Sequence, residues 1–443
     1  MNRQRTKFIP VLICFAIVFS GLVVLGPSES EGISITIVFQ DGNYSISIDK
    51  NASSDTANVK SLRSLADVVL SYPWENYSES FSNFPEELRY KLYTDLSKFV
   101  EMEPLVPPDP KCTPPVLPDP KDINCNDYPT AFNGQKRDKP AKIAHAIQLG
   151  FDVDILEIHL NELYPVVDKI FIIESKYAHF KGTRKPLIWE DVRHQPRFEK
   201  FNDKVVHFLI DNDEMLRQTS EGIWHNERYQ ERERWNRILK WNEETHYFSD
   251  DDMIGFGDAD EICCTKNLQL LRVCKADGPV DIGVWFTHGI MERKFYSHFP
   301  VRGHPDTLGD PTFFTFEQAK RKLPYPSRMR GKAGRYLLGG MHLSLYQYLP
   351  SRMVKQIAQT EFDEQQFAAM RKDLRNGVTL AELESINKKQ TVTTKTQKFV
   401  LVNQNEIGKN QFIIPWFLNC NRKRYPSLFE GLGSDTRYNA RIK

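Results

Sequence analysis

Three carboxylates stand within four positions in this sequence, directly after an apolar run over residues 253–257: Asp258, Asp260 and Glu261. Side chains alternate along a strand, so Asp258 and Asp260 share a face if the strand continues through both. Two carboxylates on one face supply the oxygen ligands that Mg²⁺ or Mn²⁺ prefers, and such an ion keeps positions open for substrate phosphates. The pattern predicts a metal site for a substrate such as a sugar-nucleotide diphosphate, whose leaving group departs as an anion. The alternative is a polar turn after a buried strand.

The elements around this acidic stretch alternate between strand and helix. Apolar runs predict strands over residues 169–174, 205–210, 253–258 and 282–286. Helical patterns cover residues 154–164, 223–245 and 268–273. This alternation is typical of an α/β fold with a parallel sheet core, in which ligands bind at the carboxyl ends of strands. Neither a GxGxxG motif nor a P-loop is present, so a nucleotide must be held by other means.

Several ordered stretches, taken together, resemble a known family. They are residues 152–163, residues 167–175 with Gly182 and residues 185–187, the acidic stretch 257–262, residues 339–344, and residues 415–418 with Asn421 and Tyr425. The chain resembles glycosyltransferase family 17 over about residues 142–429, which leaves out the N-terminal part. Cys263 stands where the family has proline, and Met341 where it has tryptophan. These departures bear on the choice of acceptor more than on the fold.

The resemblance implies a fold of the GT-A type, with a single Rossmann-like nucleotide-binding domain. It also implies an inverting, metal-dependent β-1,4-N-acetylglucosaminyltransferase. The donor would be UDP-GlcNAc, the acceptor a mannose of an N-glycan, the metal Mn²⁺ and the setting the Golgi lumen.

With this resemblance, Asp258 and Asp260 are expected to hold the ion that carries the diphosphate. Glu261 would orient a ligand or a sugar hydroxyl, or make a structural hydrogen bond. His342 would complete the metal shell, because neutral imidazole suits Mn²⁺; a packed core histidine is the alternative.

Four further residues are expected to bind the donor. Glu174, at the end of a strand, would contact the nucleoside, and Lys185 a phosphate. Arg232 and Arg234 would reach the diphosphate from a long helix, although helix arginines commonly face solvent. The general base that an inverting transfer needs is not identified; Asp306, Glu317, Glu361 and Asp363 are candidates.

The N-terminal part indicates a membrane anchor. Residues 8–26 are apolar and long enough to span a bilayer, and Arg3, Arg5 and Lys7 precede them. We therefore expect a cytoplasmic tail over residues 1–7, a transmembrane signal anchor over residues 8–26, and a single-pass type II Golgi membrane protein with its body in the lumen. A cleaved signal peptide is the alternative.

A stem is expected over residues 27–103, and a small accessory domain is the alternative. Three glycosylation acceptor sites, at Asn43, Asn51 and Asn76, fit a lumenal position. Apolar and polar residues alternate over residues 33–48 on either side of Asp41-Gly42, and this pattern predicts a hairpin. A proline-rich linker over residues 104–124 separates the stem from a catalytic domain over residues 125–430, which a tail over residues 431–443 follows.

Cysteine content and charge narrow the class of protein further. One of the seven cysteines, Cys14, lies in the membrane segment; the other six favour disulfides in an oxidising lumen, and Cys112 with Cys125 is the expected local pair. The net charge of +1 provides no reason to expect a nucleic-acid partner. Two other functions stay open: a metal-dependent phosphohydrolase that uses the same acidic stretch, and a non-catalytic glycan-binding protein.

Overall fold

A computed structural model describes the chain in two compact units, residues 1–57 and 58–443. In the first unit it describes three strands. In the second it describes residues 65–101, 106–211, 224–288, 290–295, 299–322, 324–344, 349–360, 362–377, 399–401, 414–425 and 428–429.

The strands of the first unit are β1 (Val23–Val24), β2 (Ser34–Gln40) and β3 (Asn43–Asp49). β2 and β3 pair antiparallel with Gln40 opposite Asn43, which confirms the predicted hairpin. Most of the predicted membrane segment lies outside the described residues. Val23 and Val24 form a short strand on β2 rather than the end of a helix. Within the described ranges, no helix has the length and apolarity needed to cross a bilayer.

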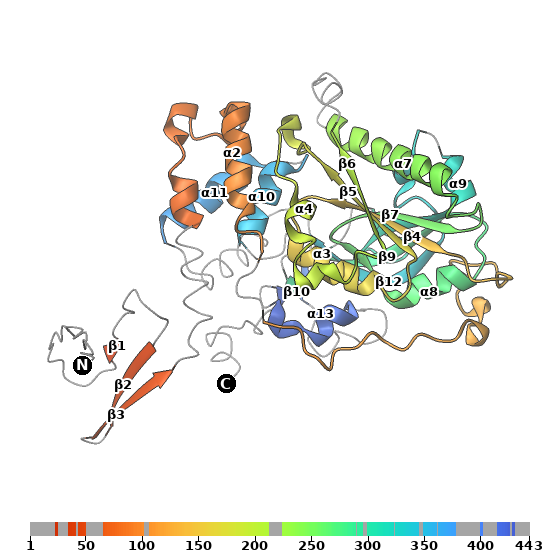
Figure 1. Cartoon of the computed structure of the whole chain (residues 1–443), viewed down its shortest axis with the longest axis horizontal. Helices are drawn as coiled ribbons and strands as arrows, with labels where there is room; N and C mark the ends of the chain where they lie inside the picture. Colours follow the sequence, from red (N-terminus) through yellow and green to blue (C-terminus); the bar gives the residue numbers. More distant parts are fainter. Residues whose placement is uncertain are drawn as a thin grey trace, which may run out of the picture. The chain divides into compact units, whose positions relative to one another are not determined.

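The described part of the second unit is built on a mixed sheet of ten strands, and Figure 1 shows its position among the helices. Four strands form its parallel part, in the order β7-β4-β5-β6. They are β4 (Ile143–Leu149), β5 (Lys169–Ser175), β6 (Val205–Ile210) and β7 (Met253–Asp258). Their apolar residues suit strands that are covered on both faces. The predicted strands at 169–174, 205–210 and 253–258 are confirmed. β4 was not predicted, since His145 and Gln148 interrupt its apolar run.

Helices connect and cover these strands. Two of them confirm predicted helices: α3 (Val153–Leu163), which follows β4, and α7 (His225–Thr245), which leads into β7. The remaining described helices of this α/β body are α4 (Ile188–Val192), α5 (Pro196–Glu199), α8 (Thr265–Val273), α9 (Phe316–Lys320) and α13 (Trp416–Cys420).

The sheet continues with strands that are mainly antiparallel. β11 (Thr307–Thr315) pairs with β7 and with β9 (Val280–His288), and beyond β9 lie β10 (Ile290–Phe295) and β13 (Phe399–Leu401). β12 (Tyr336–Ser344) runs parallel to β9 and antiparallel to β8 (Glu261–Cys263). This pairing brings residues 339–344 beside the acidic stretch, although about 80 residues separate them in the sequence.

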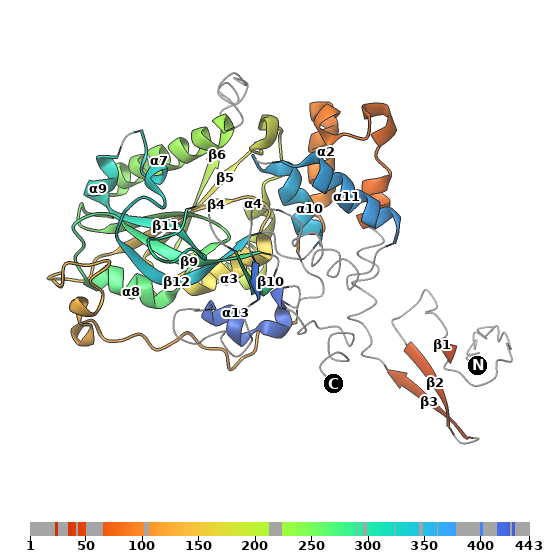
Figure 2. The same ribbon diagram turned by 180° about the vertical axis from the view of Figure 1, so that it is seen from behind.

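The helix α2 (Glu86–Ser97) packs beside α10 (Leu349–Ala358) and α11 (Glu364–Arg375), as Figure 2 shows. Apolar side chains of residues 65–100 belong to the same buried cluster as those of β4 and α3. The helix α2 lies within the range expected to be a stem, and it belongs to the second unit. The two compact units meet after Ala57, whereas the prolines led us to expect a boundary near Cys125.

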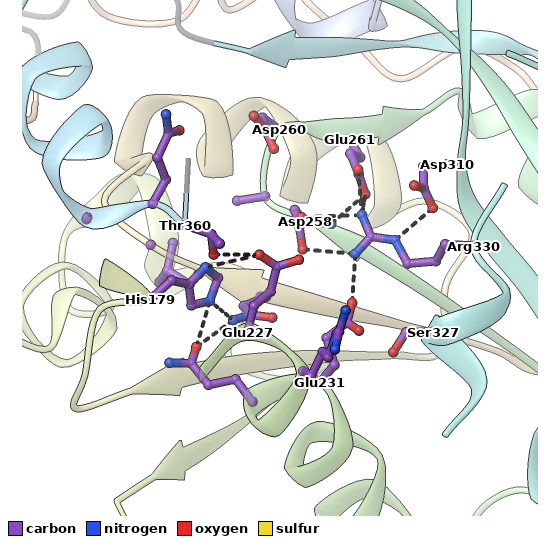
Figure 3. Close-up of a pocket in the computed structure, with 18 of the residues that line it drawn as sticks. His179, Glu227, Glu231, Asp258, Asp260, Glu261, Asp310, Ser327, Arg330 and Thr360 are labelled. Carbon is purple, nitrogen blue, oxygen red and sulfur yellow. Dashed lines mark hydrogen bonds and ion pairs between the residues drawn. The ribbon is translucent and has the colours of Figure 1, made fainter. Parts of the chain in front are cut away.

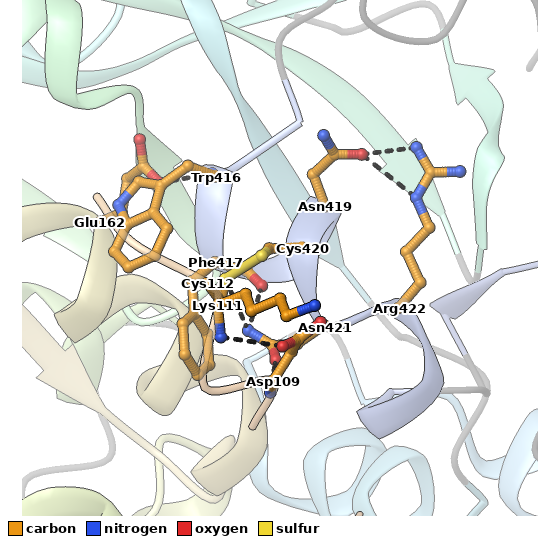
Figure 4. The surroundings of a disulfide bond; sticks show 10 residues. All are labelled: Asp109, Lys111, Cys112, Glu162, Trp416, Phe417, Asn419, Cys420, Asn421 and Arg422. Atoms are coloured by element: carbon orange, nitrogen blue, oxygen red, sulfur yellow. Dashed lines mark hydrogen bonds between the residues drawn. A yellow bond between two sulfur atoms is a disulfide. The ribbon is translucent and has the colours of Figure 1, made fainter. Parts of the chain in front are cut away.

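The proline-rich segment is tied to the body by two disulfides. Cys112 pairs with Cys420 (Figure 4), and Cys125 pairs with Cys274. The expected Cys112–Cys125 pair is wrong, because the extended segment between these cysteines carries them to different partners. Cys263 and Cys264 are buried free thiols.

Candidate functional site

The order of the parallel strands creates a crevice between β4 and β7. The chain leaves β4 toward β5 on one side, whereas β7 lies on the other, and ligands of open α/β sheets bind at such a switch point. A cavity of about 810 Å³ opens there. Its walls include Gly150 and Asp152 after β4, the residues 258–261 after β7, and side chains from α7.

The acidic stretch forms a tight turn at this crevice. β7 ends at Asp258 and β8 begins at Glu261, so the strand does not run through Asp260 as expected. Both aspartates nevertheless line the cavity. The Asp258 side chain is 42% exposed, whereas that of Asp260 is 8% exposed. The turn therefore gives the two carboxylates different surroundings and different partners.

Arg330 is the basic partner on one side of the turn (Figure 3). Its guanidinium donates to both oxygens of Glu261, at 2.6 and 2.7 Å, and lies 3.3 Å from Asp258 Oδ2. It also contacts Asp310 at 2.8 Å and Glu231 at 3.2 Å. Four carboxylates thus surround one guanidinium, whose side chain is 14% exposed.

Glu261 holds the turn in shape. Its Oε2 accepts a hydrogen bond of 2.8 Å from the backbone N–H of Asp258. Burial raises the pKa of Glu261 to about 8, even though Arg330 acts in the opposite direction. These partners give Glu261 the structural hydrogen bond that the sequence analysis named as the alternative to binding a ligand or sugar hydroxyl.

Lys355 is the basic partner on the other side. Its Nζ donates to Asp260 Oδ2 at 2.6 Å and to Asp152 Oδ1 at 3.2 Å, and so joins the segments that follow β4 and β7. Burial alone would raise the pKa of Asp260, but Lys355 and His342 outweigh it, so this pKa lies well below its ordinary value. Asp260 therefore carries its negative charge throughout the neutral range.

His342 lies on β12, opposite Glu261 of β8. Its Nε2 is 3.4 Å from Asp260 Oδ2, and its ring stacks on Phe286 with centroids 4.8 Å apart. The buried Nδ1 finds no hydrogen-bond partner among the described residues. The structure thus brings His342 to Asp260, as expected, but Asp258 lies with Arg330.

Asp260 Oδ2 and His342 Nε2 are an oxygen and a nitrogen of the kinds that a divalent ion takes as ligands, and Lys355 Nζ lies 2.6 Å from the same oxygen. The described part of the chain contains no group of three or more His, Cys, Asp or Glu residues that could hold a metal ion. A pair is nevertheless a common protein contribution where substrate phosphates complete the coordination. The pair departs from the expected set only in leaving out Asp258.

The residues expected to bind the donor lie mostly behind the cavity wall. Glu174 is fully buried and accepts from the backbone of Ile188 and Trp189. Lys185 reaches the cavity wall, but its Nζ lies 3.3 Å from Glu174. This ion pair explains the presence of both residues by a structural role.

The two arginines of α7 differ from each other. Arg234 is fully buried and donates to the Gly257 carbonyl at 3.0 Å, while its guanidinium lies 4.0 Å from Asp258. Arg234 therefore supports the acidic turn from behind. Arg232 packs over the ring of Tyr229 at 5.4 Å and is not among the residues that line the cavity.

A polar network that the sequence did not suggest lines another part of the cavity. His179 follows β5, and its Nε2 lies 3.0 Å from Gln230 Oε1 of α7. Gln148 of β4 donates to the same Gln230 oxygen at 2.6 Å. Glu227 accepts from Thr360 at 2.8 Å. These side chains come from elements far apart in sequence, so no local motif marks them.

Three charged residues at the site were also missed: Arg330, Lys355 and Asp310. Arg330 follows a short 3₁₀ turn, and Lys355 stands on an amphipathic helix, where lysine ordinarily faces solvent. None of the four base candidates is among the residues that line the cavity. Asp363 caps α11 through Gln365 and Gln366, and Glu317 pairs with Arg321; Glu361 lies outside the described residues.

Comparison with known proteins agrees with the resemblance. The model of glycosyltransferase family 17 matches residues 109–292. A rat (Rattus norvegicus) and a human (Homo sapiens) protein, each named β-1,4-mannosyl-glycoprotein 4-β-N-acetylglucosaminyltransferase, are each 26% identical to this chain over 90 residues. That segment is 20% of this chain but only 16% and 17% of the rat and human proteins, about a sixth of their length.

Proposed function

We propose that this chain, which the family model assigns to glycosyltransferase family 17 over residues 109–292, transfers N-acetylglucosamine from UDP-GlcNAc to a mannose of an N-glycan. The observation that carries the proposal is the pairing of an acidic turn with basic side chains in one cavity at the switch point. Asp258, Asp260, Arg330 and Lys355 all line that cavity. A sugar-nucleotide diphosphate needs such a site, because its charge must be held as the sugar departs.

The donor would bind across the ends of β4 and β7 with its diphosphate at the turn. Asp260 and His342 would hold a divalent ion, Mn²⁺ by the resemblance, which would neutralise charge on the leaving diphosphate. Lys355 and Arg330 add positive charge on either side of the turn. The network of His179, Gln148 and Gln230 provides hydrogen-bonding groups for the rest of the donor.

The transfer would be an inverting displacement on a domain of the GT-A type. The acceptor hydroxyl oxygen attacks the anomeric carbon from the face opposite the diphosphate, and the bond from that carbon to the diphosphate oxygen breaks. The acceptor proton then has to pass to a carboxylate on the acceptor side. The parallel strands with an antiparallel extension support the assignment of the domain to the GT-A type.

A lumenal Golgi setting with a type II membrane anchor over residues 8–26 belongs to the same proposal. Its support is the apolar run that follows three basic residues, together with the two disulfides, which form and persist in an oxidising compartment.

The test is incubation of the full-length chain with several UDP-sugars and defined N-glycans, with the linkage of each product determined. We expect transfer from UDP-GlcNAc, its loss in chelator, and its return with Mn²⁺. Mn²⁺ binding measured by calorimetry should weaken in Asp260→Asn and in His342→Ala, and much less in Asp258→Asn. Transfer that persists in chelator would refute the metal assignment. Donor hydrolysis that no acceptor changes would instead indicate a phosphohydrolase.

A further inference from the structure

The carboxylates that line the cavity come from two halves of the sheet. Asp152 follows β4, Asp258 ends β7 and Asp260 follows it, and Glu227 and Glu231 stand on α7. These five belong to the parallel half, where the donor is proposed to bind. Asp310 and Glu261 lie instead on antiparallel strands, Asp310 on β11 and Glu261 on β8. In Figure 3 Asp310 lies on the side of Arg330 away from His179 and Glu227.

The backbone of β11 directs Asp310 into the cavity. The register between β11 and β9 shifts between Gly309 and Thr312, and a bulge of this kind re-aims the side chain that it contains. Asp310 Oδ1 accepts a hydrogen bond of 2.8 Å from Arg330 Nε. The side chain is 13% exposed and lines the cavity. Arg330 thus holds one oxygen of a carboxyl group that borders the cavity.

An exposed aromatic ring lies beside Asp310 in the same wall. Phe299 is 64% exposed and lines the cavity, and its carbonyl accepts a hydrogen bond of 3.0 Å from the Gly309 N–H. An exposed aromatic at a cavity is suited to the apolar face of a sugar ring. The carboxylate and the ring together form a surface for a sugar that bears a hydroxyl.

We propose that Asp310 is the general base of the transfer and that Phe299 supports the acceptor sugar beside it. This assignment rests on the proposed function. Asp310 Oδ2 takes the proton of the acceptor hydroxyl while the hydroxyl oxygen bonds to the anomeric carbon. The bond from that carbon to the diphosphate oxygen breaks, and UDP leaves with the bonding electron pair.

The surroundings of Asp310 suit a base that works near neutral pH. Burial raises its pKa to about 7, Arg330 opposes this rise, and the charges of Asp258 and Asp281 add to it. Glu261 of β8, which shares Arg330, is more deeply buried and has both oxygens bound to that guanidinium. The efficiency of a general base is highest when its pKa lies near the working pH.

Asp310→Asn tests the assignment, because asparagine retains an oxygen for Arg330 but cannot take the proton. The full-length variant should lose roughly 10²- to 10⁴-fold in kcat. Its affinity for UDP, measured by calorimetry, should stay within about threefold of wild type. Glu317→Gln on the exposed face of α9 is the matched control and should leave kcat unchanged. Phe299→Ala should raise KM for the acceptor while KM for the donor stays the same.

The pH profile provides a measurement that does not depend on the folding of a variant. Wild-type kcat/KM should rise as the pH increases through about 7, since Asp310 must be deprotonated to act. Asp310→Asn should lack this rise. More than a tenth of wild-type kcat in Asp310→Asn, a matching loss of UDP affinity, or a flat wild-type profile would overturn the assignment. If the wild type transfers no sugar at all, the proposed function fails as well.

Discussion

At the scale of single residues, two buried histidines lie directly behind the acidic turn. His145 of β4 and His159 of α3 are fully buried, with ring centroids 5.1 Å apart. His159 Nδ1 lies 2.9 Å from the Ala259 carbonyl and donates to it, so this ring supports the turn. Both nitrogens of His145 lack a hydrogen-bond partner in the described ranges. Burial lowers the pKa of His159 to about 4 and that of His145 well below its ordinary value, so both rings are neutral.

These histidines predict a loss of stability in mild acid. The unfolded chain binds a proton at each histidine below about pH 6.5, whereas the folded chain does not, so the free energy of unfolding falls as the pH falls. His145 alone should contribute about 2 kcal/mol to the difference between pH 7.5 and pH 5. His145→Phe should reduce this difference by that amount in urea unfolding. The exposed His194→Gln is the control. An unchanged pH dependence in His145→Phe would show that the ring is protonated inside the fold.

At the scale of elements, α10 connects the N-terminal helices to the site. Its Lys355 reaches Asp152 and Asp260, while the Ile357 carbonyl accepts a hydrogen bond of 2.7 Å from Tyr93 of α2. Ser351 donates to the Val100 carbonyl, also at 2.7 Å. The helix that carries a basic side chain into the cavity is thus positioned by residues 65–100.

Glu364, in the first turn of α11, makes the most concentrated polar contact with that N-terminal segment. It accepts from the backbone N–H of Phe81 and Ser82 and from the hydroxyls of Ser80 and Ser82, at 2.8 to 3.1 Å. Glu364→Ala leaves these donors without an acceptor and should lower the free energy of unfolding by about 2–4 kcal/mol. Glu87→Ala, at an exposed position of α2, should change it by less than about 0.5 kcal/mol. Equal stability of the two variants in chemical denaturation would mean that this docking contributes little.

At the scale of the whole molecule, residues before the first Rossmann-like strand are part of the core. Leu65, Val69, Phe81 and Leu96 are fully buried, and each large apolar side chain contributes about 1.5–3 kcal/mol by its burial. The Cys112–Cys420 disulfide closes a loop of 308 residues around the α/β body. Starting the chain inside the proline-rich segment would remove both contributions.

Two truncations test this organisation. A chain that starts at residue 58 should fold with a cooperative thermal transition, because it retains the whole second unit. A chain that starts at residue 122 should be insoluble or lack that transition, because it loses residues 65–101 and leaves Cys420 without Cys112. Circular dichroism and differential scanning calorimetry distinguish these outcomes. Equal stability of the two chains would restore the boundary near Cys125.

The sequence by itself determined the elements whose signals are local. The strands at 169–174, 205–210 and 253–258 and the helix predicted at 223–245 follow from patterns within short windows. The acidic stretch was recognisable from its own residues, although the strand was expected to run through Asp260 and ends at Asp258. The approach of His342 to the turn was expected from the family resemblance, and pairing of β12 with β8 produces it.

Only the tertiary structure decided which charges meet. Arg330 and Lys355 reach the turn from about 70 and 95 residues further along the chain, and Asp310 enters the cavity through a bulge in β11. Glu174 and Lys185 have the residue types of a donor site, yet they pair with each other at its wall. Such outcomes depend on strand register and helix packing between distant segments, and no spacing within a single stretch of sequence encodes them.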